Sequence, residues 1–132
     1  MKHTIIASDD IDNIWSDVEP LIKRTSDELL DEDDVHQLLK EGTLLLWIIT
    51  DENGEIVTAM TLAIQKYPRV TSLRIVTCGG ERMKEWLDDF LEKVEDFAKE
   101  CGCSYIDIDG RSGWSKILKD YHVDYITLRK KL

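Results

Sequence analysis

The chain has 132 residues, of which 42% are hydrophobic and 33% are charged, and its formal net charge is −10 at pH 7. This length suits a single domain over residues 1–132, and the lack of an apolar run of about 18 residues excludes a membrane-spanning segment. A surface this acidic repels phosphate backbones, which excludes nucleic acid as a partner.

The cysteines and the first residues indicate a cytoplasmic protein. The start "MKHTIIASDD" has no apolar stretch long enough for a signal peptide. Cys78, Cys101 and Cys103 are few and odd in number, which favours reduced thiols over disulfides. The C-x-C pair has no nearby partner ligands, so we expect no metal site.

The first part of the chain predicts a short strand and two helices. A strand is expected over residues 4–7, and "DDIDNIWSDVEPLIKRTSD" places its apolar residues on one helical face. Pro20 removes a backbone donor inside this segment, so we expect a kink or a break near Val18–Glu19. "DEDDVHQLLKEG" predicts a second helix, whose acidic start suits the helix dipole and which Gly42 ends.

Three strands are then predicted in an antiparallel meander. "TLLLWIIT" is continuously apolar, as expected of a strand that is buried on both faces. Asn53-Gly54 is a strong hairpin signal and leads into "EIVTAMTLAIQKY", which is rich in β-branched residues. After Pro68, "VTSLRIVT" predicts the third strand.

A long helix over Glu81–Cys101 is predicted next, because its apolar residues form one unbroken stripe. The stripe consists of Met83, Trp86, Leu87, Phe90, Leu91, Val94, Phe97, Ala98 and Cys101. Gly102 ends this helix, and "SYIDID" predicts a short strand. Ser112 is expected to cap a short helix that contains Trp114, and "YHVDYITLRKKL" predicts a final strand.

The predicted order is therefore β-α-α-β-β-β-α-β-α-β. The first half of the sheet is antiparallel, because its strands follow one another closely. A helix separates the third meander strand from "SYIDID", and such a connection favours a right-handed parallel crossover. The sequence thus predicts an α/β fold with a mixed sheet.

This order resembles that of the GCN5-related N-acetyltransferases, the GNAT fold, over nearly the whole chain. The segments "IWSDVEPLIKR", "GEIVTAMTLAIQKYPRVTSLRIVTCGGERMKEWL" and "DFAKECGCSYIDIDGRSGWSKILKDY" are similar to small GNAT-like proteins encoded by tailed phages and prophages. The resemblance implies a central parallel strand pair, "SLRIVT" and "SYIDID", that splays apart.

In the GNAT fold, acetyl-coenzyme A lies in the notch between these two strands. Its pantetheine pairs with the backbone of the earlier strand, and its pyrophosphate sits at the start of the following helix, where free amides and the helix dipole attract an anion. The two glycines allow positive φ angles and close backbone approach. The resemblance implies a cofactor site at Ile75, Val76, Thr77, Cys78, Gly79, Gly80, Glu81 and Arg82.

The loop "CGGERMK" departs from the acyltransferase motif Q/R-x-x-G-x-G/A, because the regular basic-x-x-Gly spacing is missing. Glu81 falls where the pyrophosphate would lie, and its carboxylate repels the ligand unless Arg82 and Lys84 turn inward. Two interpretations stay open. The loop is either a cradle with weak or no acetyl-coenzyme A binding, or a pair of glycines that turns the chain.

Amine acetylation needs a base for the attacking amine and an acid for the departing thiolate. GNAT enzymes often place a tyrosine acid where this sequence has Leu118, and Tyr121 follows three residues later. Asp107 and Asp109 alternate on one strand face, so either is a candidate base, although such carboxylates are usually just solvated. Tyr121, Asp107 and Asp109 are the catalytic candidates. Arg111, beside glycines and Trp114, is a candidate recognition point on the surface.

We therefore expect a phage-type GNAT-like protein with a degenerate acetyl-coenzyme A site that acts without catalysis, as a virion, assembly or adaptor protein. The alternative is an acetyl-coenzyme A-dependent N-acetyltransferase of an unknown amine. A third interpretation, resting on charge alone, is a regulator that binds a host protein. We expect a protein partner from the phage particle or the bacterial host, and a location in the bacterial cytoplasm or in the virion.

Overall fold

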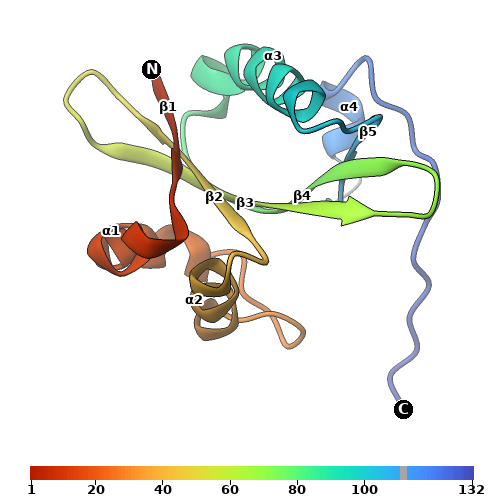
Figure 1. The fold of residues 1–132 in the computed structure, drawn as a ribbon, viewed down its shortest axis with the longest axis horizontal. Coiled ribbons are helices and arrows are strands. Elements are labelled where there is room, and N and C mark those ends of the chain that lie inside the picture. The colour runs from red at the N-terminus through yellow and green to blue at the C-terminus, as the bar shows by residue number, and fades with distance from the viewer. Residues whose placement is uncertain (111–112) are drawn as a thin grey trace.

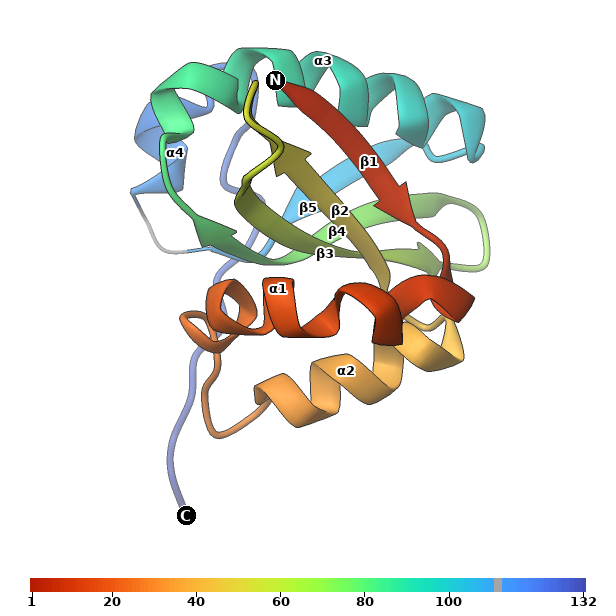
Figure 2. The same cartoon turned by 90° about the vertical axis from the view of Figure 1, so that its left-hand side faces the viewer.

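A computed structural model describes residues 1–110 and 113–132 of the chain. Within these residues, a five-stranded sheet in the order β1-β2-β3-β4-β5 carries helices on both faces (Figures 1 and 2). In chain order the elements are β1 (Lys2–Ile6), a 3-10 turn (Ser8–Asp10), α1 (Ile11–Lys23), α2 (Glu32–Glu41), β2 (Leu45–Thr50), β3 (Ile56–Lys66), β4 (Thr71–Gly80), α3 (Met83–Glu100), β5 (Tyr105–Ile108) and α4 (Trp114–Ile117).

The sheet is mixed, as the sequence predicts. β1, β2, β3 and β4 pair antiparallel in succession, whereas β4 and β5 pair parallel. In the parallel pair, Leu73 lies opposite Ile106 and Ile75 lies opposite Ile108. Helix α3 connects these two strands, so the predicted parallel crossover between "SLRIVT" and "SYIDID" is confirmed.

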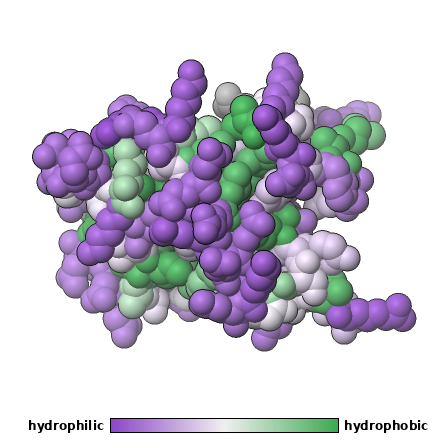
Figure 3. All heavy atoms as spheres, turned by 90° about the horizontal axis from the view of Figure 1, so that it is seen from above, coloured by the Kyte–Doolittle hydropathy of each residue, from purple (hydrophilic) through white to green (hydrophobic). Residues whose placement is uncertain are grey.

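Helix α3 covers one face of the sheet and encloses the first of two apolar clusters (Figure 2). Its residues Trp86, Phe90 and Val94 are buried against strand residues that include Met60 and Leu73. The stripe that the sequence predicts as core is therefore confirmed as the inner face of α3. Hydrophilic side chains dominate the opposite, outer side of this layer, with hydrophobic ones showing between them (Figure 3).

Helices α1 and α2 cover the other face of the sheet and enclose the second cluster (Figure 2). Val18 and Ile22 of α1 and Leu39 of α2 are buried there against Leu46 and Ala59 of the sheet. The side chain of Asp31 accepts a hydrogen bond from the Asp34 backbone, and the reverse bond completes a capping box at the start of α2.

Of the kink or break predicted near Val18–Glu19, the break is wrong, because α1 continues through Pro20 to Lys23. A proline in a helix leaves the carbonyl four residues earlier without its donor. Here both Pro20 and Ser16, which carries that carbonyl, are on the exposed side of α1. Water can hydrogen-bond the freed carbonyl there, so the helix tolerates the proline.

The predicted final strand is also wrong. After α4 the chain runs past the β3–β4 hairpin and away from the sheet, and residues 121–132 are in no strand (Figure 1). A strand forms where its backbone pairs with a neighbour, and the β-branched composition of "YHVDYITL" does not supply that neighbour. Ser112, the expected cap of α4, and Arg111, the candidate recognition point, lie outside the described residues.

Candidate functional site

The notch between β4 and β5 begins at a β-bulge in β4. Thr77 lies opposite Thr61 of β3, and Ile75 lies opposite Leu62, so Val76 is left as an extra residue between the two pairs. An extra residue of this kind bends its strand and increases the local twist. The bulge therefore turns the second half of β4 away from the course of β5.

The two parallel strands separate directly after this bulge. Their pairing ends at Ile75 and Ile108, and the next backbone bond, from the Asp109 amide to the Ile75 carbonyl, is already long at 3.4 Å. From Thr77 to Gly80, β4 is paired with β3, and from Val76 to Gly80 it has no strand on its other side in the described part of the chain. An extended ligand could pair with this open backbone edge.

The positive φ angles that the two glycines allow are not adopted. Gly79 and Gly80 are the last residues of β4, and neither has a positive φ. Other atoms do approach the two glycines closely, but these atoms belong to α1 and β3 rather than to a ligand. A Cβ on Gly79 would lie 2.0 Å from the Leu21 carbonyl oxygen, and one on Gly80 would lie 2.3 Å from Thr58 Oγ1. The glycines therefore let α1 and β3 pack closely against β4.

The turn into α3 is made by Arg82 instead. Its φ of 60° and ψ of 34° are left-handed, a conformation that an L residue adopts only with support. Both backbone groups of the preceding residue, Glu81, are held by hydrogen bonds. Its amide donates to the Val57 carbonyl, and its carbonyl accepts from the indole of Trp86. Because of this turn, α3 starts at Met83, two residues later than predicted.

The charged side chains at the start of α3 are engaged in ion pairs. The Arg82 guanidinium binds Glu85 in α3 and lies 3.2 Å from Asp51 Oδ2 in the β2–β3 turn. It therefore does not turn inward to offset Glu81, as a phosphate site would need. The Glu81 carboxylate lies 3.2 Å from Arg24 Nη2 at the end of α1, and both side chains are exposed.

The hydroxyl groups next to the notch are also satisfied within the protein. Thr58 Oγ1 donates to the Gly79 carbonyl at 3.0 Å, and the hydroxyls of Thr61 and Thr77 lie 2.6 Å apart. Burial raises the pKa of the Cys78 thiol to about 11, so this thiol is protonated at neutral pH. The side chains along the notch thus provide structural hydrogen bonds and a thiol in its unreactive form.

The two candidate bases are held by one arginine. Arg74 on β4 lies opposite Asp107 on β5, and its guanidinium contacts both carboxylate oxygens of Asp109 at 2.7 and 2.6 Å. Asp107 also accepts a hydrogen bond from the hydroxyl of Ser72. The hydrogen bonds to the Tyr125 hydroxyl and to Asp109 raise the pKa of Arg74, so the cation is permanent. Both carboxylates are therefore engaged as partners of a fixed charge.

The third candidate, Tyr121, lies at the other end of α3 from the start of that helix. It lines a cavity together with Glu95 and Ala98, and Glu95 is about 18 Å along α3 from Met83 at the helical rise. Burial raises the pKa of Tyr121 to about 12, and its hydroxyl is enclosed without a hydrogen-bond partner among the described residues. The structure does not bring Tyr121 together with the Val76–Arg82 segment.

The sequence interpretation missed the part played by Arg74. A signal for it was present, because a parallel pairing of "SLRIVT" with "SYIDID" sets the arginine of the first strand against the aspartates of the second. It also missed His3, whose ring is nearly buried and contacts Trp47 and Asp89. Nothing in the sequence around His3 marks this contact, since its partners lie in β2 and α3.

Within residues 1–110 and 113–132, no group of three or more histidine, cysteine, aspartate or glutamate side chains is arranged to hold a metal ion. No helix in the same residues is both long enough and apolar enough to cross a membrane.

The comparisons with known proteins bear on the fold. No family model and no curated protein matches the sequence. Among solved structures, the ribosomal-protein-alanine N-acetyltransferase of Brucella melitensis biovar Abortus 2308 matches all of this chain and all of its own, with a TM-score of 0.74 and 12% identity. Glucosamine-6-phosphate N-acetyltransferase of Arabidopsis thaliana matches 99% of each chain, with a TM-score of 0.67 and 15% identity.

An aminoglycoside acetyltransferase from an uncultured soil metagenomic sample, solved with sisomicin, matches 99% of this chain and 95% of its own, with a TM-score of 0.68 and 14% identity. At these identities the likeness concerns the fold alone. The chain therefore has the GNAT fold, in an α+β arrangement with a five-stranded mixed sheet and a parallel β4–β5 pair. Its structural neighbours include acetyltransferases.

The notch fits acetyl-coenzyme A in one respect and not in another. The open backbone edge from Val76 to Gly80 suits the extended, amide-bearing pantetheine arm. The charges at the start of α3 do not suit the pyrophosphate, because Arg82 is held by Asp51 and Glu85 while Glu81 adds a carboxylate. The edge of β4 thus suits the pantetheine arm, whereas the side chain of Arg82 is not free to meet the pyrophosphate.

Proposed function

We propose that this protein is a GNAT-fold binding protein with weak or no affinity for acetyl-coenzyme A and without acetyl transfer, and that it acts through a protein partner. The observation that carries the proposal is the engagement of Arg82 by Asp51 and Glu85 beside the exposed carboxylate of Glu81. A pyrophosphate approaching α3 would meet the carboxylates of Glu81 and Glu85 near the amides that should bind it.

Two electrostatic effects compete at this site. The start of a helix offers roughly half a positive charge and several free amides to an anion. The local carboxylates oppose this attraction, and so does the negative field of the chain, whose net charge is −10. The long-range repulsion of a polyanionic cofactor is strongest at low salt, because counterions screen it at higher ionic strength.

The absence of transfer is supported by the positions of the candidate catalytic groups. Asp107 and Asp109 are bound to Arg74, and Tyr121 lies far along α3 from the notch. The thiol of Cys78, which does lie beside the notch, is protonated at neutral pH. None of these four groups is both next to Val76–Gly80 and free to remove a proton from an amine.

An acetyl-coenzyme A-dependent N-acetyltransferase remains the second candidate function. It is favoured by the bulge at Val76 and by the open edge of β4 that follows it, since these would accept the pantetheine arm. In this alternative a water molecule or the substrate itself would have to supply the proton transfers. The two candidates differ in whether coenzyme A is released when an amine is added.

Titration calorimetry of the wild-type protein with acetyl-coenzyme A at low and at physiological ionic strength tests the proposal. We expect no binding, or binding that is weak and that improves as salt screens the repulsion. A thermal-shift titration provides the second readout, because a ligand at about 100 times its Kd adds about 2.7 kcal/mol of stability. A Kd near a micromolar, or coenzyme A release with any of a panel of primary amines, would favour the transferase.

A role in a phage particle or as an adaptor for a host protein extends this proposal. It is supported by the resemblance to phage-encoded proteins and by exposed apolar side chains along the C-terminal segment, which include Val123, Ile126 and Leu128. Mass spectrometry of purified particles from the encoding phage or prophage tests the virion role. Enrichment of the chain in intact particles is expected of a virion protein, and its presence only in the lysate would favour the adaptor.

A further inference from the structure

A groove at the edge of the sheet brings together all four tyrosines of the chain. Its volume is about 600 Å³, and it lies between β5, the C-terminal half of α3 and the segment that follows α4. Tyr67, Tyr105 and Tyr125 are 45%, 60% and 63% exposed, and Tyr121 forms part of the wall. We call this site the tyrosine groove.

The sheet ends in this groove with an unpaired strand. β5 pairs with β4 on one side and has no strand partner on the other among the described residues. Ser104, Tyr105, Ile106 and Asp107, which run along this edge, all line the groove. An edge strand presents unpaired backbone N–H and C=O groups, which are a template for a further strand. The groove therefore offers main-chain hydrogen bonds as well as aromatic rings.

The groove is acidic. Glu95, Asp107, Asp120 and Asp124 line it, and Lys99 and Arg74 are its permanent cations. Arg74 and Asp107 compensate one another, because the guanidinium is bound to Asp109 and lies 3.8 Å from Asp107, which leaves Glu95, Asp120 and Asp124 against Lys99. The remaining excess of carboxylates, together with exposed tyrosine rings, favours a cationic side chain, since cations are attracted to the face of an aromatic ring.

From these observations we propose that the tyrosine groove binds an extended peptide segment that carries arginine or lysine side chains. The segment adds to the free edge of β5 as a further strand, and its basic side chains lie among the tyrosines and carboxylates. This inference rests on the partner half of the proposed function and specifies the chemistry of that partner. It is independent of whether the notch binds acetyl-coenzyme A.

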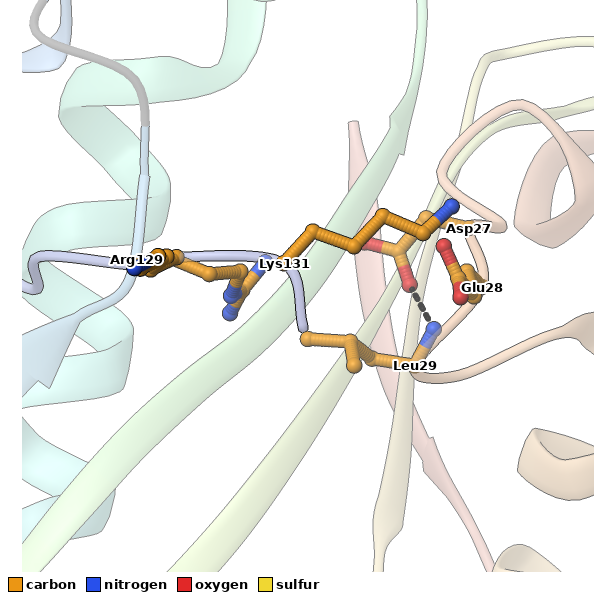
Figure 4. A pocket seen from close by; sticks show the side chains of 6 residues that line it. Asp27, Glu28, Leu29, Arg129 and Lys131 are labelled. Atoms are coloured by element: carbon orange, nitrogen blue, oxygen red, sulfur yellow. Dashed lines mark hydrogen bonds between the residues drawn. The ribbon is translucent and has the colours of Figure 1, made fainter.

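The basic residues near the C-terminus of this chain do not line the tyrosine groove. Arg129 and Lys131 line a separate cavity of about 290 Å³ with Asp27 and Glu28, and the Lys131 side chain extends toward these two carboxylates (Figure 4). The C-terminal segment thus contributes Asp120 and Tyr125 to a wall of the tyrosine groove and then leaves it. Among the described residues, no strand pairs with the outer edge of β5, so its backbone groups there have no partner in a sheet.

The test uses fluorescence anisotropy with a labelled peptide of about eight residues, the usual length of a strand, in which arginine and threonine alternate. We expect the full-length protein to bind it at about 0.15 M salt. The same peptide with N-methyl groups on alternate amides keeps its charge but cannot pair along one edge, and we expect it to bind at least about tenfold more weakly. Equal binding of both peptides would overturn the strand-addition mode.

Variants of the protein separate the groove from general electrostatic attraction. We expect Tyr105→Ala to weaken binding roughly fivefold through loss of an exposed ring. Asp124→Asn should weaken it more than Asp33→Asn, which removes the same charge from α2, outside the groove. Equal effects of the two aspartate variants, together with no effect of Tyr105→Ala, would show non-specific attraction and overturn the proposal.

A second copy of the chain is the competing occupant. Light scattering would reveal a dimer, and truncation after residue 122 would convert it to a monomer if the C-terminal segment of one copy filled the groove of another. A dimer that becomes a monomer on truncation would assign the groove to self-association and overturn the proposal. A monomeric wild type that binds the peptide supports the proposal. Failure of the peptide to bind at all overturns the groove assignment and leaves the acetyl-coenzyme A measurements unaffected.

Discussion

The indole Nε1 of Trp47 donates a hydrogen bond to Nδ1 of His3 across 3.1 Å, which joins the edge strand β1 to β2 through their side chains. The other ring nitrogen of His3 lies 3.1 Å from Asp89 on α3, and Asp89 in turn binds Lys93. Because Nδ1 accepts from the indole, the proton of the neutral ring lies on Nε2, facing Asp89. The His3 ring thus links the first strand to both the sheet and α3.

This arrangement predicts that stability falls in mild acid. Burial lowers the pKa of His3 below its ordinary value of 6.5, an effect that outweighs the opposing attraction of Asp89. Below about pH 6.5 the unfolded chain therefore binds a proton that the folded chain does not, and the free energy of unfolding decreases by at most about 1.4 kcal/mol per pH unit until the folded pKa is reached. Urea unfolding at about pH 7.5 and about pH 5.5 measures this change.

The contribution of His3 is isolated by two variants. His3→Gln removes the titrating ring, so its stability should depend less on pH in this range than that of the wild type. His122→Gln is the control, because the side chain of His122 is 86% exposed. If the wild type and His3→Gln lose stability in parallel, the pH dependence arises from other groups.

Gly79→Ala should destabilise the protein through close contact rather than through backbone conformation. The new Cβ would lie 2.0 Å from the Leu21 carbonyl oxygen, so α1 and β4 must move apart. Overpacking of this kind costs about 1–3 kcal/mol, measured as the loss in free energy of unfolding by urea. Gly113→Ala is the matched control, because its Cβ would meet nothing within 4 Å and its φ is −59°. Equal stability of the two variants would contradict the close packing of α1 on β4.

Phe90→Ala should show that α3 holds the sheet through its apolar face. Phe90 is 3% exposed and makes edge-to-face contacts with Trp47 and Trp86, at centroid distances of 5.4 and 5.9 Å. Loss of a buried phenylalanine costs about 3–5 kcal/mol, measured by chemical unfolding. Leu29→Ala, at a residue that is 64% exposed, serves as the control. A loss below about 1 kcal/mol for Phe90→Ala would place this side chain outside the core.

Glu81→Gln should strengthen acetyl-coenzyme A binding. The substitution removes the carboxylate at the start of α3 and releases Arg24 from its ion pair, so that two changes favour an incoming anion. Since exposed charge pairs contribute up to about 1 kcal/mol, we expect a gain of roughly twofold to fivefold, measured by calorimetry. Glu92→Gln makes the same charge change farther along α3 and should have a smaller effect.

The calorimetry of the wild type, Glu81→Gln and Glu92→Gln also tests whether the notch binds acetyl-coenzyme A at all. Absence of binding by both the wild type and Glu81→Gln would mean that the loop serves chain packing alone, as the contacts of Gly79 and Gly80 already do. Equal gains from Glu81→Gln and Glu92→Gln would mean that the net charge of the chain, rather than the position of Glu81, controls binding.

The sequence by itself determined the elements whose patterns are local. The apolar stripe of α3 repeats within a few residues, and the Asn53-Gly54 pair carries its own turn, so the predicted helix and hairpin both form, with α3 starting two residues later than predicted. The parallel pairing of β4 with β5 also followed from the sequence, because a helix that connects two strands of one sheet favours a parallel crossover.

Only the tertiary structure decided the roles of the site residues, because these depend on partners far away in the chain. Residue 79 has to be a glycine because α1 packs directly on it, whereas Arg82 makes the turn while its side chain binds Asp51 and Glu85. Asp109 is held by Arg74, 35 residues earlier, through a register that no local pattern contains. The final segment has β-branched residues but no strand beside it, and since a strand is stabilised by its neighbour, composition alone did not place it in the sheet.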